Sequence, residues 1–163
     1  MTTTENSVPK AAGAGHAGPR LDFAALAPEV YRAMVKLDAA SRRDVDPALA
    51  ELVRVRASQL NGCAFCVDMH TRDARQAGES EQRLHLVAAW EEAGEVFTDR
   101  ERAALALTEA VTVLTDGFVP DAVYQRAAAH FSEEELAALI TLATTINAWN
   151  RIGVSTRMTP GRA

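Results

Sequence analysis

The sequence of 163 residues has only two cysteines, few aromatic residues and no excess of positive charge. Its 17 lysine and arginine residues are outnumbered by 22 aspartate and glutamate residues, which gives a formal net charge of −5. A chain with this balance lacks the basic surface that nucleic acids require, so we expect no nucleic-acid partner. A hydrophobic content of 48% over this length instead predicts one globular domain with a substantial core.

Long apolar runs are also missing. No stretch reaches the roughly 18 consecutive apolar residues that span a bilayer, so we expect no membrane association. The first residues, M-T-T-T-E-N-S-V-P-K, lack the basic start and apolar stretch of a signal peptide. These two absences predict a cytoplasmic protein.

The two cysteines, Cys63 and Cys66, form a single C-x-x-C pair. A small secreted domain would carry more cysteines, whereas a lone C-x-x-C in a reducing compartment is typical of redox-active or metal-binding sites. A structural zinc site needs four ligands, usually from two such pairs, and the sequence has no second C-x-x-C and no H-x-x-x-H. We therefore predict a redox-active pair, with neither a metal nor a cofactor.

The organisation of the chain is predicted from composition and periodicity. Residues 1–19 are rich in Thr, Gly, Ala, Ser and Pro without periodicity, and we expect a disordered tail there and one helical domain over 20–163. Apolar residues then recur at helical spacing, and Pro28 is expected to open the first main helix. The residues with this spacing are Phe23, Leu26, Val30, Met34 and Leu37.

Local signals place the middle helices. Asp46 is expected to cap a helix that begins at Pro47, and Asn61-Gly62 is expected to end it. A third helix is predicted from about Cys63 to Ala77, with Gly78 as its stop. Residues 81–92 are expected to form a short fourth helix.

Two capping boxes, Thr98 with Glu101 and Ser132 with Glu135, predict the starts of two later helices. The first of these helices is expected to end near Asp116-Gly117, and Pro120 to start another that reaches about His130. No stretch shows sustained β alternation, so the predicted class is all-α, a bundle of about six or seven helices. The last long helix is apolar over most of its circumference, which favours an oligomer or, alternatively, a central core helix in a monomer.

The run N-G-C-A-F-C-V-D-M-H carries the candidate chemistry. If a helix begins at Cys63, then Cys63, Cys66 and His70 lie on one face, at i, i+3 and i+7. The unpaired N–H groups and the dipole of a helix N-terminus stabilise a thiolate, which favours Cys63 as the more acidic thiol. His70 is placed to exchange a proton with the sulfur site.

Glu51 is the candidate that orients His70. It lies ten residues before Asn61, and His70 lies eight residues after Gly62. If the two helices fold back antiparallel, the carboxylate and the imidazole sit at about the same height. A more open crossing angle would separate them, and the sequence leaves both arrangements open.

The run E-L-V-R-V-R-A-S-Q-L-N-G-C-A-F-C-V-D-M-H (51–70) resembles the alkylhydroperoxidase D core within the carboxymuconolactone decarboxylase superfamily, as do residues 97–112 and 146–151. The resemblance implies an all-helical fold assembled as trimers or dimers of trimers. It implies that Glu51 and His70 form a proton relay, that Cys66 is the peroxidatic cysteine and that Cys63 is the resolving one. Phe65 departs from the pattern, because the best-known peroxidases carry a histidine there.

We therefore expect a thiol peroxidase that reduces alkyl hydroperoxides or hydrogen peroxide, with electrons from a lipoyl- or thioredoxin-like dithiol partner. One alternative is a lyase of the carboxymuconolactone decarboxylase type, although such enzymes generally lack the C-x-x-C. Another alternative is a redox-sensing or partner-binding protein without catalysis, in which the disulfide switches an interface.

The remaining polar and aromatic candidates are interpreted as structural. Arg54 and Arg56 are expected to form ion pairs, and His16, His85 and His130 to be structural or exposed. In the last helix, Trp149 is expected in the core or an interface, and Asn147 as a satisfied buried polar group. Neither these two residues nor Asn150 is assigned to the site.

Overall fold

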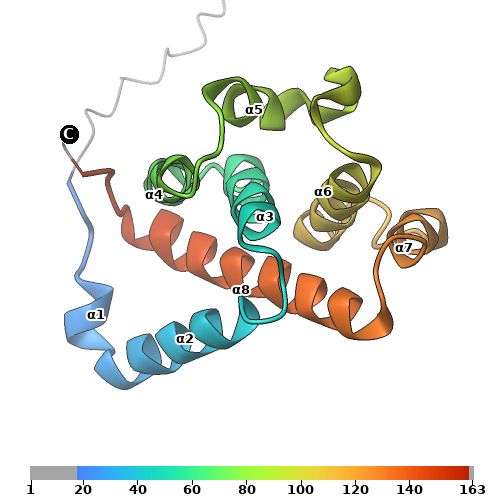
Figure 1. The fold of residues 1–163 in the computed structure, drawn as a ribbon. Coiled ribbons are helices and arrows are strands. Elements are labelled where there is room, and N and C mark those ends of the chain that lie inside the picture. Colours follow the sequence, from blue (N-terminus) through green and yellow to red (C-terminus); the bar gives the residue numbers. More distant parts are fainter. Residues whose placement is uncertain (1–17, 162–163) are drawn as a thin grey trace, which may run out of the picture.

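The computed structural model describes residues 18–161 (Figure 1). Residues 1–17 of the predicted tail lie outside this part. Within it the chain forms eight α-helices and two short 3₁₀ segments, so the all-α prediction is confirmed, with one helix more than expected. In chain order they are α1 (Phe23–Leu26), α2 (Pro28–Ser41), α3 (Pro47–Leu60), α4 (Ala64–Gln76), α5 (Glu81–Leu86), η1 (Val87–Glu92), η2 (Gly94–Val96), α6 (Asp99–Thr112), α7 (Asp121–Ala128) and α8 (Glu133–Thr156).

Helix starts follow the local signals closely. The Asp46 side chain accepts a hydrogen bond from the Leu49 N–H, and Pro47 occupies the first helical position of α3. Both predicted capping boxes are formed, at the N-termini of α6 and α8. These caps satisfy backbone N–H groups that have no partner within the helix, and each stabilises its helix by about 1 kcal/mol.

The segment 81–92 differs from the single helix expected. It is α-helical only to Leu86, and Ala89 takes a non-helical φ of −129° within η1. The guanidinium of Arg102 donates to the carbonyls of Trp90, Glu91 and Gly94. These bonds satisfy carbonyls that no longer have regular helical partners, so a contact from a distant helix stabilises the irregular segment.

Helix α6 ends at Thr112, four residues before the predicted end at Asp116. Val113 caps the helix with φ −108° and ψ 56°, and the chain then turns through Gly117 at φ 79°. Branched residues at 111–113 and 115 lower helix propensity, which accounts for the early end.

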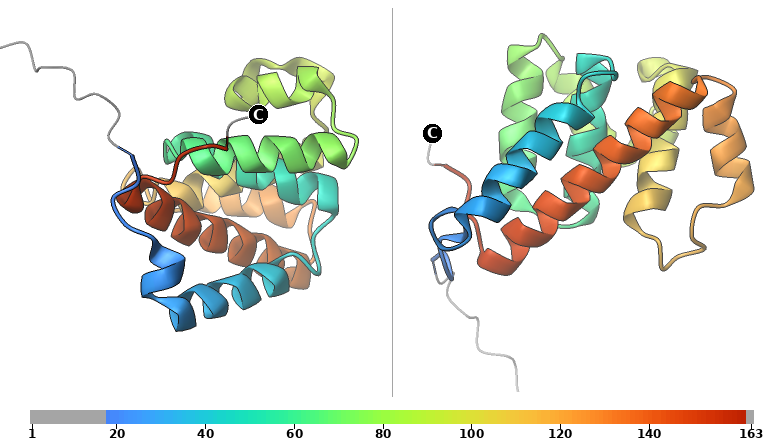
Figure 2. Two further views of the ribbon diagram at one scale, coloured as in Figure 1. Left: turned by 90° about the vertical axis from the view of Figure 1, so that its left-hand side faces the viewer. Right: turned by 90° about the horizontal axis from the view of Figure 1, so that it is seen from below.

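Helix α8 runs through the middle of the molecule. It packs against α2 on one side and against α3, α4, α6 and α7 elsewhere (Figures 1 and 2). Leu139, Leu142 and Ile146 are fully buried, and each such side chain contributes about 1.5–3 kcal/mol. Neighbours from the same chain therefore cover most of the apolar circumference of α8, as in the alternative of a central core helix.

Helix α3 joins the two halves of the core. Val53 belongs to a cluster with residues of α6, α7 and α8, whereas Leu52 and Val55 pack with Trp90, Phe97 and Leu105. Burial on both sides holds α3 rigidly, and the site begins on this helix.

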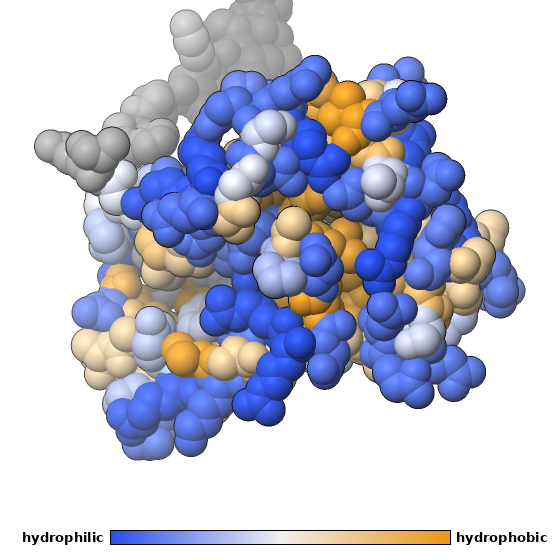
Figure 3. All heavy atoms as spheres, viewed as in Figure 1, coloured by the Kyte–Doolittle hydropathy of each residue, from blue (hydrophilic) through white to orange (hydrophobic). Residues whose placement is uncertain are grey.

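The outer surface is mostly polar. On the face drawn in Figure 3, hydrophilic residues predominate and hydrophobic ones are visible mainly in recesses between helices. Exposed apolar side chains occur on α1 and α2, including Leu26, Val30, Val35 and Leu37. Across residues 18–161, every helix is too short or too polar to cross a bilayer.

Candidate active site

A tight turn brings the candidate residues together. Gly62 has φ 64°, a left-handed conformation that glycine adopts without strain, and Cys63 follows as the N-cap of α4. The turn returns α4 alongside α3, and Oε2 of Glu51 lies 2.9 Å from Nδ1 of His70. The carboxylate and imidazole therefore sit at the same height, as an antiparallel arrangement requires.

Two interactions define the charge of Glu51. Its other oxygen, Oε1, accepts a hydrogen bond of 2.8 Å from Arg54. Burial alone would raise the pKa of the carboxyl group, but the hydrogen bond from His70 and the nearby charges of His70 and Arg54 outweigh it, and the pKa is lowered. Glu51 is thus an anion that can hold a ring proton on Nδ1 and leave Nε2 free to exchange another.

Arg54 is the buried cation of the site, with only 1% of its surface exposed. Besides Glu51 it reaches Asp38 of α2, at 3.4 Å, and Asp38 also pairs with Arg42. The predicted ion pairs are thereby confirmed, since Arg56 pairs with Glu109 in the same way. Arg54 links α3 to α2 and fixes the side of Glu51 that faces away from His70.

Both cysteines are buried and free of any disulfide. The Cys66 thiol donates a hydrogen bond to the Cys63 sulfur, and mainly for this reason the pKa of Cys63 falls to about 6. The same hydrogen bond, together with burial and the charge on Cys63, raises the pKa of Cys66. The pair therefore holds one proton near neutral pH, with the thiolate on Cys63 and the proton on Cys66.

A pocket of about 310 Å³ opens beside the pair. Cys66 and His70 are among its lining residues, and Cys63 is not. Tyr31 and Trp149 meet edge to face in its wall, with ring centroids 5.6 Å apart. The full lining is Tyr31, Val35, Asp38, Arg42, Arg54, Phe65, Cys66, Met69, His70, Asp73, Trp149 and Met158.

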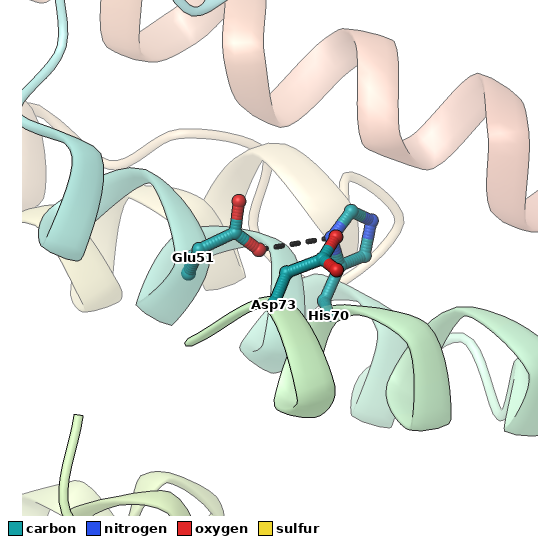
Figure 4. A group of neighbouring side chains, drawn as sticks. All are labelled: Glu51, His70 and Asp73. Atoms are coloured by element: carbon teal, nitrogen blue, oxygen red, sulfur yellow. Dashed lines mark hydrogen bonds and ion pairs between the residues drawn. The ribbon is translucent and has the colours of Figure 1, made fainter. Parts of the chain in front are cut away.

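Asp73 is a site residue that the sequence reasoning missed. It lies one turn after His70 on α4, and its carboxylate approaches the Glu51–His70 pair (Figure 4). Donor atoms of these three residues lie within 4.8 Å of one another, an arrangement able to hold a cation. Neither cysteine belongs to this group, and the adjacent Arg54 guanidinium opposes a second cation there. The i, i+3 spacing from His70 was the available signal.

Helix α8 supplies two further residues that the sequence did not assign to the site. Trp149 lines the pocket, and Asn150 is fully buried beside the cysteines, where its amide helps to lower the pKa of both thiols. Their positions depend on how α8 crosses the turn between α3 and α4. By contrast His85 and His130 are exposed, as expected, and His16 lies outside the described residues.

Residues 28–110 match the carboxymuconolactone decarboxylase family. The chain belongs to this family. It is 39% identical to the uncharacterized protein YdfG of Bacillus subtilis (strain 168), over 83% of this chain and 92% of YdfG. Its fold matches the crystal structure of ATU0492, a protein of unknown function from Agrobacterium tumefaciens for which an antioxidant-defence role of the AhpD kind has been suggested. The TM-score is 0.86 at 36% identity, over 89% of this chain and 99% of that one.

A second crystal structure, an uncharacterized peroxidase-related protein from Ralstonia eutropha JMP134 with an alkylhydroperoxidase D core, shares the fold. The TM-score is 0.75 at 23% identity, over 85% of this chain and 74% of that one. The protein is therefore an alkylhydroperoxidase D-like member of the carboxymuconolactone decarboxylase family. The family match includes Glu51, both cysteines and His70, whereas Trp149 and Asn150 lie outside it.

Proposed function

We propose that this protein is a thiol peroxidase that reduces alkyl hydroperoxides, with Cys66 as the attacking cysteine, Cys63 as the resolving one and Glu51 with His70 as the proton relay. One observation carries the proposal: Cys66 and His70 line the same pocket, and His70 is hydrogen-bonded to the buried carboxylate of Glu51. A sulfur, a proton carrier and room for an organic substrate thus occur in one place.

In the first step the Cys66 proton passes to His70, and the new thiolate attacks the terminal oxygen of the hydroperoxide. The O–O bond breaks, Cys66 becomes a sulfenic acid, and the departing alkoxide takes the proton from His70 to leave as an alcohol. Glu51 stabilises the imidazolium in between.

In the second step the thiolate of Cys63 attacks the Cys66 sulfur. The S–O bond breaks, a disulfide forms, and the departing hydroxide takes a proton from solvent to become water. The lowered pKa of Cys63 supports this order, because the resolving sulfur is already an anion when the sulfenic acid appears. A dithiol reductant, such as a lipoyl- or thioredoxin-like protein, then restores both thiols by exchange.

The pocket favours organic hydroperoxides over hydrogen peroxide. Apolar and aromatic side chains form much of its lining, and Phe65 adds an apolar wall where the best-known peroxidases have histidine. Without that histidine, proton transfer at the sulfur relies on His70 and Glu51.

The decisive experiment mixes reduced protein with cumene hydroperoxide or hydrogen peroxide and counts free thiols over time. Wild type should lose two thiols, and Cys63→Ser should lose one as Cys66 becomes a trappable sulfenic acid. His70→Ala and Glu51→Gln should slow oxidation by about 10²–10⁴-fold, the usual contribution of acid–base catalysis. His85→Ala, at an exposed histidine, is the matched control. Thiols that react no faster than free cysteine would contradict the proposal.

We also propose that the protein is a homo-oligomer, a trimer or hexamer. The support is the exposed apolar surface on α1 and α2, where Leu26 keeps 73% of its area accessible. Since Tyr31 and Val35 of α2 also line the pocket, assembly through this helix would bear on access to the cysteines.

A further inference from the structure

Helix α8 lies directly against the two sulfurs. Gly153 marks the contact, because a Cβ atom there would lie 3.0 Å from Sγ of Cys63 and 3.7 Å from Sγ of Cys66. Asn150 lies one turn earlier on the same face of the helix and is fully buried, and its amide is one of the causes that lower the pKa of both thiols. An uncharged amide thus occupies the side of the cysteine pair formed by α8.

The orientation of this amide follows from a chain of hydrogen bonds. Nδ2 of Asn61 lies 2.9 Å from the Ala57 carbonyl, which can only accept, so this end of Asn61 is the donor. Its two hydrogens are shared among the Ala57 carbonyl, Oδ1 of Asn147 and Oδ1 of Asn150, the last at 3.0 Å. Since Nδ2 of Asn61 cannot accept, the atom of Asn150 that faces it is the acceptor oxygen. The amide group of Asn150 therefore presents its two N–H donors away from Asn61, and one of them reaches Oγ of Ser58 at 3.0 Å.

We propose that Asn150 is the thiolate-binding residue of this site: its amide N–H, aimed by Asn61 and Ser58, stabilises the negative charge of the dithiol on either sulfur. The inference rests on the proposed function and adds to it a donor on α8 that serves both steps. When Cys66 gives its proton to His70 before attack, the same amide is available to the sulfur that becomes the second anion. A preorganised donor in a water-poor site stabilises developing charge strongly.

A purely structural role would be to tie α8 to the turn between α3 and α4. Asn147 offers the matched comparison, because it belongs to the same network one turn earlier. Its Oδ1 accepts from Asn61, and its Nδ2 donates to Thr112 and to the Ala143 carbonyl. If anchoring alone mattered, Asn147→Ala and Asn150→Ala would affect the cysteines alike.

The test is the pH titration of the thiolate, followed by absorbance near 240 nm in reduced protein. Asn150→Ala should move the midpoint upward by about one to two pH units, the value of a hydrogen bond to a charged group. It should also shift the equilibrium with a dithiol buffer toward the disulfide, because the reduced form loses stabilisation. Asn147→Ala should leave the titration midpoint unchanged within a few tenths of a pH unit. It should leave the equilibrium constant with the dithiol buffer unchanged within about twofold.

Asn150→Asp provides a second variant if Asn150→Ala does not fold. It keeps the size and the acceptor for Asn61 but replaces the donor with a charged oxygen, so its midpoint should also rise. An unchanged midpoint in a folded Asn150 variant, or an equal shift in Asn147→Ala, overturns the inference. Neither measurement uses peroxide, so the two proposals can fail separately. If wild type fails to react with peroxide but the Asn150 variants still shift the midpoint, the proposed function is contradicted and the role of Asn150 is not.

Discussion

At the scale of single residues, the state of the two thiols depends on one shared proton. The hydrogen bond from Cys66 lowers the pKa of Cys63 to about 6, and the N-terminus of α4 adds unpaired N–H groups at the same place. The thiolate fraction grows as pH rises through the pKa of the folded protein. Most of the molecules should therefore carry a thiolate at pH 7, well below the ordinary titration of cysteine.

The first prediction concerns this titration. Reduced wild-type protein should show one thiolate appearing with a midpoint near pH 6, as the pKa of Cys63 requires. Cys66→Ala removes the main donor, so the midpoint should rise toward that of free cysteine, about 8.5. Absorbance near 240 nm or the pH dependence of alkylation gives both values. A midpoint that stays near 6 in Cys66→Ala would show that the hydrogen bond is not the cause.

The second prediction concerns Arg54, which is buried between Glu51 and Asp38. Arg54→Met leaves Glu51 without its cation and Asp38 with Arg42 alone, and it should lower the free energy of unfolding by about 3 kcal/mol. It should also raise the pKa of Glu51, since one of the causes that lower it is gone.

Arg42→Met is the control for this change, because Arg42 pairs with the same Asp38 from the surface. An exposed pair is worth at most about 1 kcal/mol. Denaturant unfolding measures both variants, and equal losses would mean that burial does not set the contribution of Arg54.

Residue spacing could predict some of the site and not the rest. Glu51, Cys66 and His70 lie on two helices joined by a short turn, so counting residues from Gly62 predicts the carboxylate beside the imidazole if the helices pack antiparallel. The crossing angle itself came only from the structure. Asn150 is far from them in the sequence, and an asparagine in an apolar helix has many structural explanations. Only the packing of α8 on the turn brings its amide to the sulfurs.

At the scale of elements, helix starts were predictable and some helix ends were not. Caps at Asp46, Thr98 and Ser132 are local side-chain hydrogen bonds that depend on a few neighbouring residues. The irregular η1 segment instead depends on Arg102 from α6, and no local pattern encodes that contact.

The third prediction concerns the place where α8 meets α4. In a helix, Gly153→Ala would ordinarily stabilise by about 1 kcal/mol. Here the new methyl group meets the Cys63 sulfur at 3.0 Å, and Cys63 is buried and fixed as the N-cap of α4. We expect overpacking to outweigh propensity and to lower the stability of the reduced protein by about 1–3 kcal/mol.

Thermal unfolding of reduced protein measures this effect. Val154→Ala, at the exposed neighbouring position, is the control and should change stability little. A Gly153→Ala variant more stable than wild type would mean that α8 can move away from the sulfurs.

At the scale of the whole molecule, α2 is the least covered of the long helices. Only Ser41 among its residues is buried, and α8 is its main partner in the chain. The side chains of Val30 and Leu37 lie two turns apart and are both exposed. This surface is the region through which we expect copies of the chain to assemble.

The fourth prediction therefore joins two substitutions, Val30→Asp and Leu37→Asp. Charges on an apolar interface oppose association, so the double variant should dissociate toward monomers. Light scattering coupled to size-exclusion chromatography measures the mass. Lys36→Ser, at an exposed polar position of the same helix, should leave it unchanged. A monomeric wild type at all concentrations would remove the basis of this prediction.

The position of α8 over the cysteines also has a consequence during protein synthesis. Residues 63 and 66 leave the ribosome well before residues 133–156, so the helix that covers the sulfurs is made long after them. Until α8 docks, the nascent chain offers an open thiol pair to any oxidant or disulfide nearby. Completion of the chain, and not the folding of α3 and α4 alone, then sets the moment at which this reactive pair becomes shielded.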